Sequence, residues 1–228
     1  MARARGVIVT VDGPAASGKS TAARNLAAAL RLPFIGTGAL YRAVALAALR
    51  RRGGVPSDAG LIRIARGMTV TFVPSRGRRG ARVHIGGRDV TDELQLPEVA
   101  RLASERVAGV PRVRDAVNAM ARRLAAVRGA VAEGRDCGTV IFPDAPIKLF
   151  LTASVAERVR RRLLDLRQLG LQADPRKLAR DIRRRDHTDA TRPVGALRPA
   201  VDAWIVDTTG QTPAAMHRRL LRLTGRCR

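Results

Sequence analysis

Residues 13–20 combine the groups that a phosphate-binding loop requires. They read GPAASGKS and fit the pattern G-x-x-x-x-G-K-[ST]. Small residues let backbone N–H groups turn toward one anion, and a helix that starts at the loop adds its partial positive charge. Lys19 can then reach the β- and γ-phosphates of a nucleotide, and the Ser20 hydroxyl can bind Mg²⁺. The stretch therefore predicts a site for a nucleoside triphosphate.

The context of this loop supports that interpretation. Lysine occurs only at Lys19, Lys148 and Lys177, so a chance match to the pattern is expected in roughly two of a thousand such chains. Residues 6–11 are apolar and predict a buried strand before the loop. Residues 18–30 have helical spacing, with Leu26 and Leu30 on one face.

The other elements must position this loop. Short apolar runs at 130–132, 147–151 and 204–206 are typical of central parallel strands. Between them the spacing predicts helices, at 40–52, 61–66, 97–107, 111–126, 154–169, 175–185 and 213–223. Alternation at 68–73, 82–85 and 88–90 predicts a small antiparallel insertion. We therefore expect an α/β fold with a mainly parallel sheet.

Composition limits the function classes. The 228 residues carry a net charge of +24, but aromatic residues make up only 3% and are scattered. A single-strand binding surface needs aromatic side chains among its charges, so we expect anionic ligands without specific nucleic-acid binding. No apolar run approaches the length of a membrane span, and residues 7–11 are too few for a signal-peptide core. We expect a cytoplasmic protein.

The phosphate loop alone fits several enzyme classes. A GTPase would need a guanine-reading motif such as N-K-x-D, which the chain lacks, and a large ATPase would need more residues. One α/β unit with the loop near its start points to a small kinase. In such a kinase the acceptor phosphate is already anionic, so no general base is needed and catalysis relies on positioning and charge neutralisation.

Further motifs suggest which kinase this is. They are TGALYR at 37–42, PEV at 97–99, VPRVR at 110–114, EGRDCGTVIFPDA at 133–145, the stretch from Arg185 to Arg192, and DTT at 207–209. In content and order they resemble the bacterial cytidylate kinase family. The resemblance implies transfer of a phosphoryl group from ATP to CMP or dCMP, with Mg²⁺ as cofactor, by a monomer.

The resemblance also implies an architecture. It is a single domain with a three-layer kinase core at 1–36, 129–153 and 193–228. A region that binds the nucleoside monophosphate occupies 37–128 and includes the antiparallel insertion at about 68–95. A helical lid occupies about 154–192.

Site residues follow by motif position. The residues expected to bind ATP form the loop, namely Gly13, Pro14, Ala15, Ala16, Ser17, Gly18, Lys19, Ser20 and Thr21, with Ser20 on the metal. Those expected to act in catalysis are Lys19, Arg42, Arg135, Arg158, Arg162 and Arg192, with Arg161 a further candidate among the lid arginines. Those expected to bind CMP are Thr37, Arg42, Ser104, Arg114, Arg135, Asp136, Arg185, Asp189 and Arg192.

Within CMP, the resemblance assigns a role to each group. Arg42, Arg135, Arg192 and Thr37 hold the phosphate, and Arg185 and Asp189 hold the ribose hydroxyls. Asp136, Arg114 and Ser104 read cytosine: a carboxylate accepts from its N4 amino group, and donors serve O2 and N3. Uracil reverses this polarity at N3 and position 4, which gives a physical basis for discrimination.

The chain departs from the family's usual pattern at several positions. Gly36 stands where an aspartate is usual, Ala16 where a glycine is usual, and Thr188 where an arginine is frequent; PVGA at 193–196 replaces a common AVAP. Two alternative functions remain open. One is a related kinase that prefers UMP or AMP, and the other is a weakened kinase scaffold that binds nucleic acid through its basic surface.

Overall fold

The computed structural model describes residues 6–75, 81–168 and 170–225. The chain divides into two compact units. The first unit comprises residues 1–7 and 31–132, and the second comprises 8–30 and 133–228. Residues 31–36 and 129–132, which the sequence assigned to the kinase core, are thus grouped with the first unit. Each unit is described separately below.

Parallel strands form the base of the second unit. Strand β1 (Ile8–Asp12) pairs in parallel with β7 (Ile147–Thr152), and β7 pairs in parallel with β8 (Trp204–Asp207). Asp12 lies opposite Phe150, and Thr152 lies opposite Asp207. The carboxyl ends of the three strands therefore meet at one edge, where parallel α/β sheets bind their ligands. Both the phosphate loop and the DTT motif begin at this edge.

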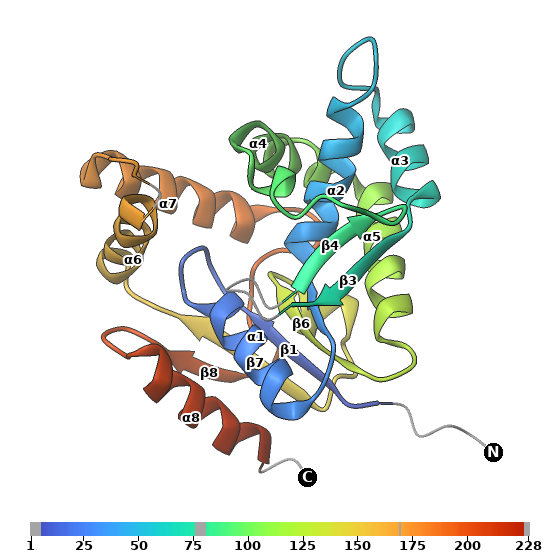
Figure 1. Ribbon diagram of the computed structural model, residues 1–228. Helices are drawn as coiled ribbons and strands as arrows, with labels where there is room; N and C mark the ends of the chain where they lie inside the picture. The colour runs from blue at the N-terminus through green and yellow to red at the C-terminus, as the bar shows by residue number, and fades with distance from the viewer. Residues whose placement is uncertain (1–5, 76–80, 169, 226–228) are drawn as a thin grey trace, which may run out of the picture. The chain divides into compact units, whose positions relative to one another are not determined.

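Four helices complete the second unit: α1 (Lys19–Leu30), α6 (Val155–Gln168), α7 (Pro175–Thr191) and α8 (Pro213–Gly225). Helix α1 packs on β1 and on α8, and α6 packs on α7 (Figure 1). The sheet strands are apolar because they are covered; Val9, Val11, Leu149 and Leu151 are all fully or almost fully buried.

The first unit combines helices with a small antiparallel sheet. Its helices are α2 (Thr37–Leu49), α3 (Asp58–Gly67), α4 (Pro97–Glu105) and α5 (Pro111–Ala125). The sheet contains β3 (Val70–Pro74), β4 (Ala81–Ile85) and β5 (Arg88–Asp89) (Figure 1). Helices α4 and α5 each begin with a proline in the first turn, a position that suits proline. Residues 76–80, between β3 and β4, lie outside the described residues.

Two further strands, β2 (Phe34–Gly36) and β6 (Ala130–Gly134), complete a five-stranded sheet of order β2-β6-β1-β7-β8. The α/β class, the parallel sheet and the antiparallel insertion are thus confirmed. Within the described residues, no helix is long and apolar enough to cross a membrane.

The bounds of two helices were predicted wrongly, and one strand was missed. Strand β2 was not predicted, because three residues carry too little pattern. The helix expected at 40–52 spans Thr37–Leu49, and Arg50 caps its end, three residues before two glycines with positive φ, Gly53 and Gly54. The helix expected at 175–185 continues to Thr191. Its last turns carry Asp186 and Asp189, whose partners lie elsewhere in the second unit, so local sequence could not reveal what stabilises them.

Candidate active site

The phosphate loop joins β1 to α1 and has the backbone that such a loop needs. Gly13, Ala16 and Gly18 have φ angles of +148°, +59° and +86°. A Cβ atom on Gly13 would lie 2.0 Å from the carbonyl oxygen of Leu151, so the close approach of the loop to β7 requires glycine. Ala16 adopts the left-handed conformation that the family usually gives to glycine, at a cost of roughly 1 kcal/mol.

Lys19 is the first residue of α1 and is buried. Its ammonium group donates to the carbonyl oxygen of Pro14 at 3.0 Å and lies 3.7 Å from the Glu133 carboxylate. Burial, with the charge of Arg135 beside it, lowers the pKa of Lys19 to about 7, while the Glu133 carboxylate acts in the opposite direction. An anion held by the loop would add further negative charge beside this ammonium group and favour its charged form.

Asp12 anchors the loop that follows β6. Its two carboxylate oxygens accept hydrogen bonds from the backbone N–H groups of Cys137 and Gly138, at 2.9 and 2.7 Å. Burial raises the pKa of Asp12 to about 6, although these two bonds act in the opposite direction. The bonds fix residues 137–141 as a short helical turn directly after Arg135 and Asp136. Sequence reasoning missed Asp12, although a carboxylate at the end of a buried strand was the available signal.

Three residues assigned to CMP come together at Asp189 on α7. The Asp189 carboxylate accepts from Arg135 Nε at 2.9 Å and from Arg192 Nη2 at 2.8 Å. Burial acts to raise its pKa, but Arg135, Arg192 and Arg185 outweigh burial and hold the pKa below the ordinary value. This buried carboxylate therefore fixes two of the arginines assigned to the CMP phosphate.

Helices α6 and α7, which the resemblance assigns to a lid, are joined through Arg158. Its guanidinium binds both carboxylate oxygens of Asp186 on α7, at 2.9 and 2.6 Å, and also donates to the carbonyl oxygen of Ala153. Arg158 is 4% exposed, so it is held in place in this structure. Arg162, the second lid arginine assigned to catalysis, is exposed to solvent. Sequence reasoning did not identify the partner of Arg158, since Asp186 lies 28 positions away.

Four further CMP-assigned residues belong to the first unit. Thr37 begins α2 and is buried, and Arg42 follows one turn later on the same helix. Arg114 on α5 is 2% exposed and places its guanidinium over the ring of Tyr41, 5.4 Å from the centroid. The Ser104 hydroxyl donates to the Ala100 carbonyl within its own helix. The structure thus holds Arg114 in a defined position within this unit, whereas Ser104 bonds locally.

Gly36, where the family usually has aspartate, ends β2 and precedes the first residue of α2. Its φ and ψ are −91° and +103°, an extended conformation open to any residue, and no side chain caps the helix. The backbone conformation therefore does not require glycine at this position.

Comparisons with known proteins agree with the motifs. Residues 9–225 match the family model described as cytidylate kinase. Proteins named cytidylate kinase from Salmonella arizonae and Escherichia coli are each 42% identical over 202 residues, which cover 89% of this chain and 88% of theirs. A solved structure of an uncharacterized protein from Eubacterium ventriosum is 11% identical, covers 95% of this chain and 96% of its own, and has a TM-score of 0.51, which shows a likeness of fold alone.

Proposed function

We propose that this chain, which belongs to the cytidylate kinase family, transfers the γ-phosphoryl group of ATP to CMP and to dCMP. The products are ADP and CDP or dCDP. Membership of a transferase family follows from the matches over nearly the whole chain. The observation that best supports the ATP donor is the loop Gly13–Thr21, with buried Lys19 at the start of α1.

In the proposed reaction, a phosphate oxygen of CMP attacks the γ-phosphorus, and the bond from that phosphorus to the β,γ-bridging oxygen of ATP breaks, so that this oxygen leaves on the β-phosphate of ADP. The attacking oxygen is already anionic, so no side chain has to remove a proton. Catalysis then consists of holding two anions in line and neutralising the charge of the transferring group. The backbone N–H groups of the loop and Lys19 would bind the phosphates of ATP. Arg158 and Arg162 would bind the phosphoryl group during its transfer.

Mg²⁺ is proposed to bind between the ATP phosphates and the Ser20 hydroxyl. Ser20 follows Lys19 in the first turn of α1, beside the loop that would hold those phosphates. Among the described residues, no group of three or more His, Cys, Asp or Glu side chains could hold a metal ion. A single hydroxyl beside substrate phosphates suits Mg²⁺, because this ion keeps several waters and is held by substrate phosphates more than by a cage of protein ligands. When bound, the ion would withdraw charge from the phosphate oxygens.

For the acceptor, the proposal uses the residues that match the family motifs. Arg42, Arg135, Arg192 and Thr37 would hold the CMP phosphate, because the planar fork of arginine can form two bonds to a phosphate. Arg185 and Asp189 would hold the ribose. Asp189 would contribute in a second way as well, because its carboxylate fixes Arg135 and Arg192, the two arginines proposed to hold the phosphate.

Asp136, Arg114 and Ser104 are proposed to read cytosine. Asp136 and Arg114 are each 2% exposed. Both charged groups are thus held in a low-dielectric setting, where a mismatched donor or acceptor on the base is costly.

A monomeric state and a cytoplasmic location remain predictions from the sequence.

The test is a competition assay with the purified chain, Mg²⁺ and ATP, and with CMP, dCMP, UMP and AMP as acceptors. We expect CMP and dCMP to be phosphorylated with the highest kcat/KM. Faster turnover of UMP or AMP would contradict the cytosine assignments. Tight, salt-sensitive binding of DNA or RNA without CMP turnover would instead support the basic-scaffold alternative, which the net charge of +24 motivates.

A further inference from the structure

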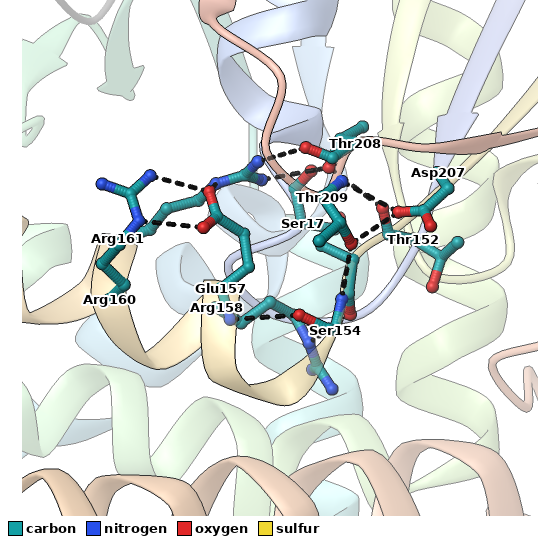
Figure 2. Close-up of polar contacts among 11 residues, drawn as sticks. Ser17, Thr152, Ser154, Glu157, Arg158, Arg160, Arg161, Asp207, Thr208 and Thr209 are labelled. Atoms are coloured by element: carbon teal, nitrogen blue, oxygen red, sulfur yellow. Dashed lines mark hydrogen bonds and ion pairs between the residues drawn. The ribbon is translucent and has the colours of Figure 1, made fainter.

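Thr208, in the loop after β8, connects three segments of the second unit. The residue is fully buried. Its hydroxyl lies 3.0 Å from the carbonyl oxygen of Ser17 in the phosphate loop and 2.9 Å from that of Thr152 at the end of β7. Its backbone N–H also donates to Thr152, at 2.8 Å. Thr208 thus links the phosphate loop to the edge of the sheet (Figure 2).

Arg161 on α6 holds Thr208 from the other side. Its Nη1 donates to the Thr208 hydroxyl at 3.0 Å, and its Nη2 donates to the Thr208 carbonyl at 2.6 Å. Its Nε donates to the Glu157 carboxylate at 2.8 Å (Figure 2). The Arg161 guanidinium therefore binds Thr208 through its two terminal nitrogens and Glu157 through Nε. It also passes close to the loop, since a Cβ atom on Gly18 would lie 3.3 Å from Nη1.

The neighbouring residues fix the loop that carries Thr208. The Thr209 hydroxyl donates to the Asp207 carboxylate at 2.7 Å and accepts from the Ser154 N–H, just before α6, at 3.0 Å. Gly210 has a φ of +68°. The DTT motif followed by glycine therefore forms a tight turn that presents Thr208 toward the phosphate loop.

A phosphate loop needs such external support because of its own geometry. Its N–H groups must point inward to the anion, so its carbonyl groups point outward and require other donors. The Ser17 carbonyl accepts a hydrogen bond from the Thr208 hydroxyl, and the Ala15 carbonyl accepts a longer one from Arg158, at 3.4 Å. These two carbonyls flank Ala16, whose φ of +59° is unfavourable for alanine.

We infer that Thr208 and Arg161 are positioning residues that hold the phosphate loop in its anion-binding conformation against the strain at Ala16. The inference rests on the proposed function, because it takes the anion to be the phosphates of ATP. Neither residue has to touch ATP for this role. Arg161, one of several lid arginines considered for the transferring phosphoryl group, acts here through Thr208 and Ser17.

The first test is Thr208→Val, which keeps the size and β-branching of the side chain and removes the hydroxyl. We expect binding of Mg·ATP, measured by calorimetry, to weaken about tenfold, the scale of one lost buried hydrogen bond. KM for ATP should rise while KM for CMP stays constant. The matched control is Thr224→Val. Thr224 is also buried, but its hydroxyl donates to the Leu221 carbonyl within α8, and its loss should leave ATP affinity unchanged.

The second test separates geometry from charge. Arg161→Lys keeps the positive charge but cannot reproduce the two bonds to Thr208 together with the bond to Glu157. We expect a loss of ATP affinity similar to that of Thr208→Val. Arg160→Lys is the control, because Arg160 contacts the same Glu157 carboxylate from an exposed position, and we expect no change there.

A double-mutant cycle with Ala16→Gly tests the link to backbone strain. Glycine adopts a positive φ without strain, so the loop should depend less on its external support. In the Ala16→Gly background, Thr208→Val should weaken ATP binding only about threefold, against about tenfold in the original chain. Such coupling would not arise if Thr208 served only to stabilise the fold.

The inference is overturned if Thr208→Val binds ATP within twofold of the unchanged chain, or if its effect is equal in both backgrounds. The proposed function is judged separately, by phosphorylation of CMP with the unchanged chain. A chain that binds ATP and loses affinity in Thr208→Val, but does not phosphorylate CMP, would contradict the proposed acceptor and support the positioning role.

Discussion

Asp189 accepts a hydrogen bond from Arg135 Nε at 2.9 Å, although the two residues are 54 positions apart. The bond joins the residue that follows β6 to the last turn of α7. It places a buried carboxylate beside Arg135, whose guanidinium also donates to the Gly134 carbonyl. The positioning of charged groups by other charged groups is a recurrent feature of the second unit.

Replacing Asp189 by asparagine should impair both stability and CMP use. The substitution removes the charge that fixes Arg135 and Arg192, so we expect kcat/KM for CMP to fall about 100-fold. The free energy of unfolding at pH 7 should fall by about 2 kcal/mol, the scale of hydrogen bonds to a charged group. Urea unfolding and steady-state kinetics measure the two effects.

The pH dependence of this effect has a definite sign. The pKa of Asp189 is held below its ordinary value, so its stabilising effect is present above that value and is lost as pH falls through the folded-state pKa. The stability difference between the chain and Asp189→Asn should therefore shrink in acid. Asp181→Asn is the control, because Asp181 pairs with Arg184 on the surface and should change stability little. A difference that grows in acid would contradict this account.

Asp12 should make an opposite contribution. Its pKa is raised to about 6, so the folded state binds the proton more tightly than the unfolded state does. Its contribution to stability is fully present below its ordinary pKa of 3.8 and is lost as pH rises through 6. Between pH 4 and pH 7, the unfolding free energy should fall by about 2 kcal/mol relative to that of Asp12→Asn.

Urea unfolding at several pH values in this window tests the prediction. Asp202→Asn serves as the control, since its interaction with Lys148 holds the pKa of Asp202 below the ordinary value and places its titration below the window. Parallel pH profiles for the unchanged chain and Asp12→Asn would contradict the prediction, because they would mean that ionising the Asp12 carboxyl group does not lower the free energy of unfolding.

Lys19→Met should abolish most phosphoryl transfer. Methionine fills a similar volume and removes the only side-chain cation of the loop, so we expect kcat to fall about 100-fold or more with the fold retained. Lys177→Met, on an exposed part of α7, should leave kcat unchanged. Circular dichroism of both variants controls for folding. Retention of kcat in Lys19→Met would contradict the proposed role of the loop.

Asp136→Ala should separate recognition of CMP from binding of ATP. If this buried carboxylate accepts from the cytosine amino group, its removal should lower kcat/KM for CMP by about 100-fold and leave ATP affinity within about twofold. Asp165→Ala, at an exposed position on α6, is the comparison. An unchanged kcat/KM for CMP would remove Asp136 from the site.

The sequence predicted the parts of this molecule that depend on local pattern. The phosphate loop, the apolar strands and the antiparallel insertion were all recognisable, because alternation, glycine spacing and a scarce lysine are visible within short windows. The family followed from motifs spread over residues 37–209, and the matched relatives confirm it.

The parts that escaped prediction depend on contacts between distant residues. Asp12 binds N–H groups 125 and 126 positions away, and Thr208 reaches Ser17 across 191 positions. The sequence marks Asp12 as a carboxylate at the end of a strand and Thr208 as part of the DTT motif, but it does not show which groups either residue binds. The extension of α7 to Thr191 has the same cause, since Asp186 and Asp189 are held by Arg158 and Arg135.

The central claim is phosphorylation of CMP, and one assay tests it most directly. The purified chain is incubated with Mg²⁺, ATP and equal concentrations of CMP, UMP and AMP, and the diphosphates are separated and quantified. The account predicts that CDP forms first. UDP should form at least about 100 times more slowly, and so should ADP beyond the one molecule that is released with each CDP. Preferential formation of UDP, or of ADP from AMP, would contradict it.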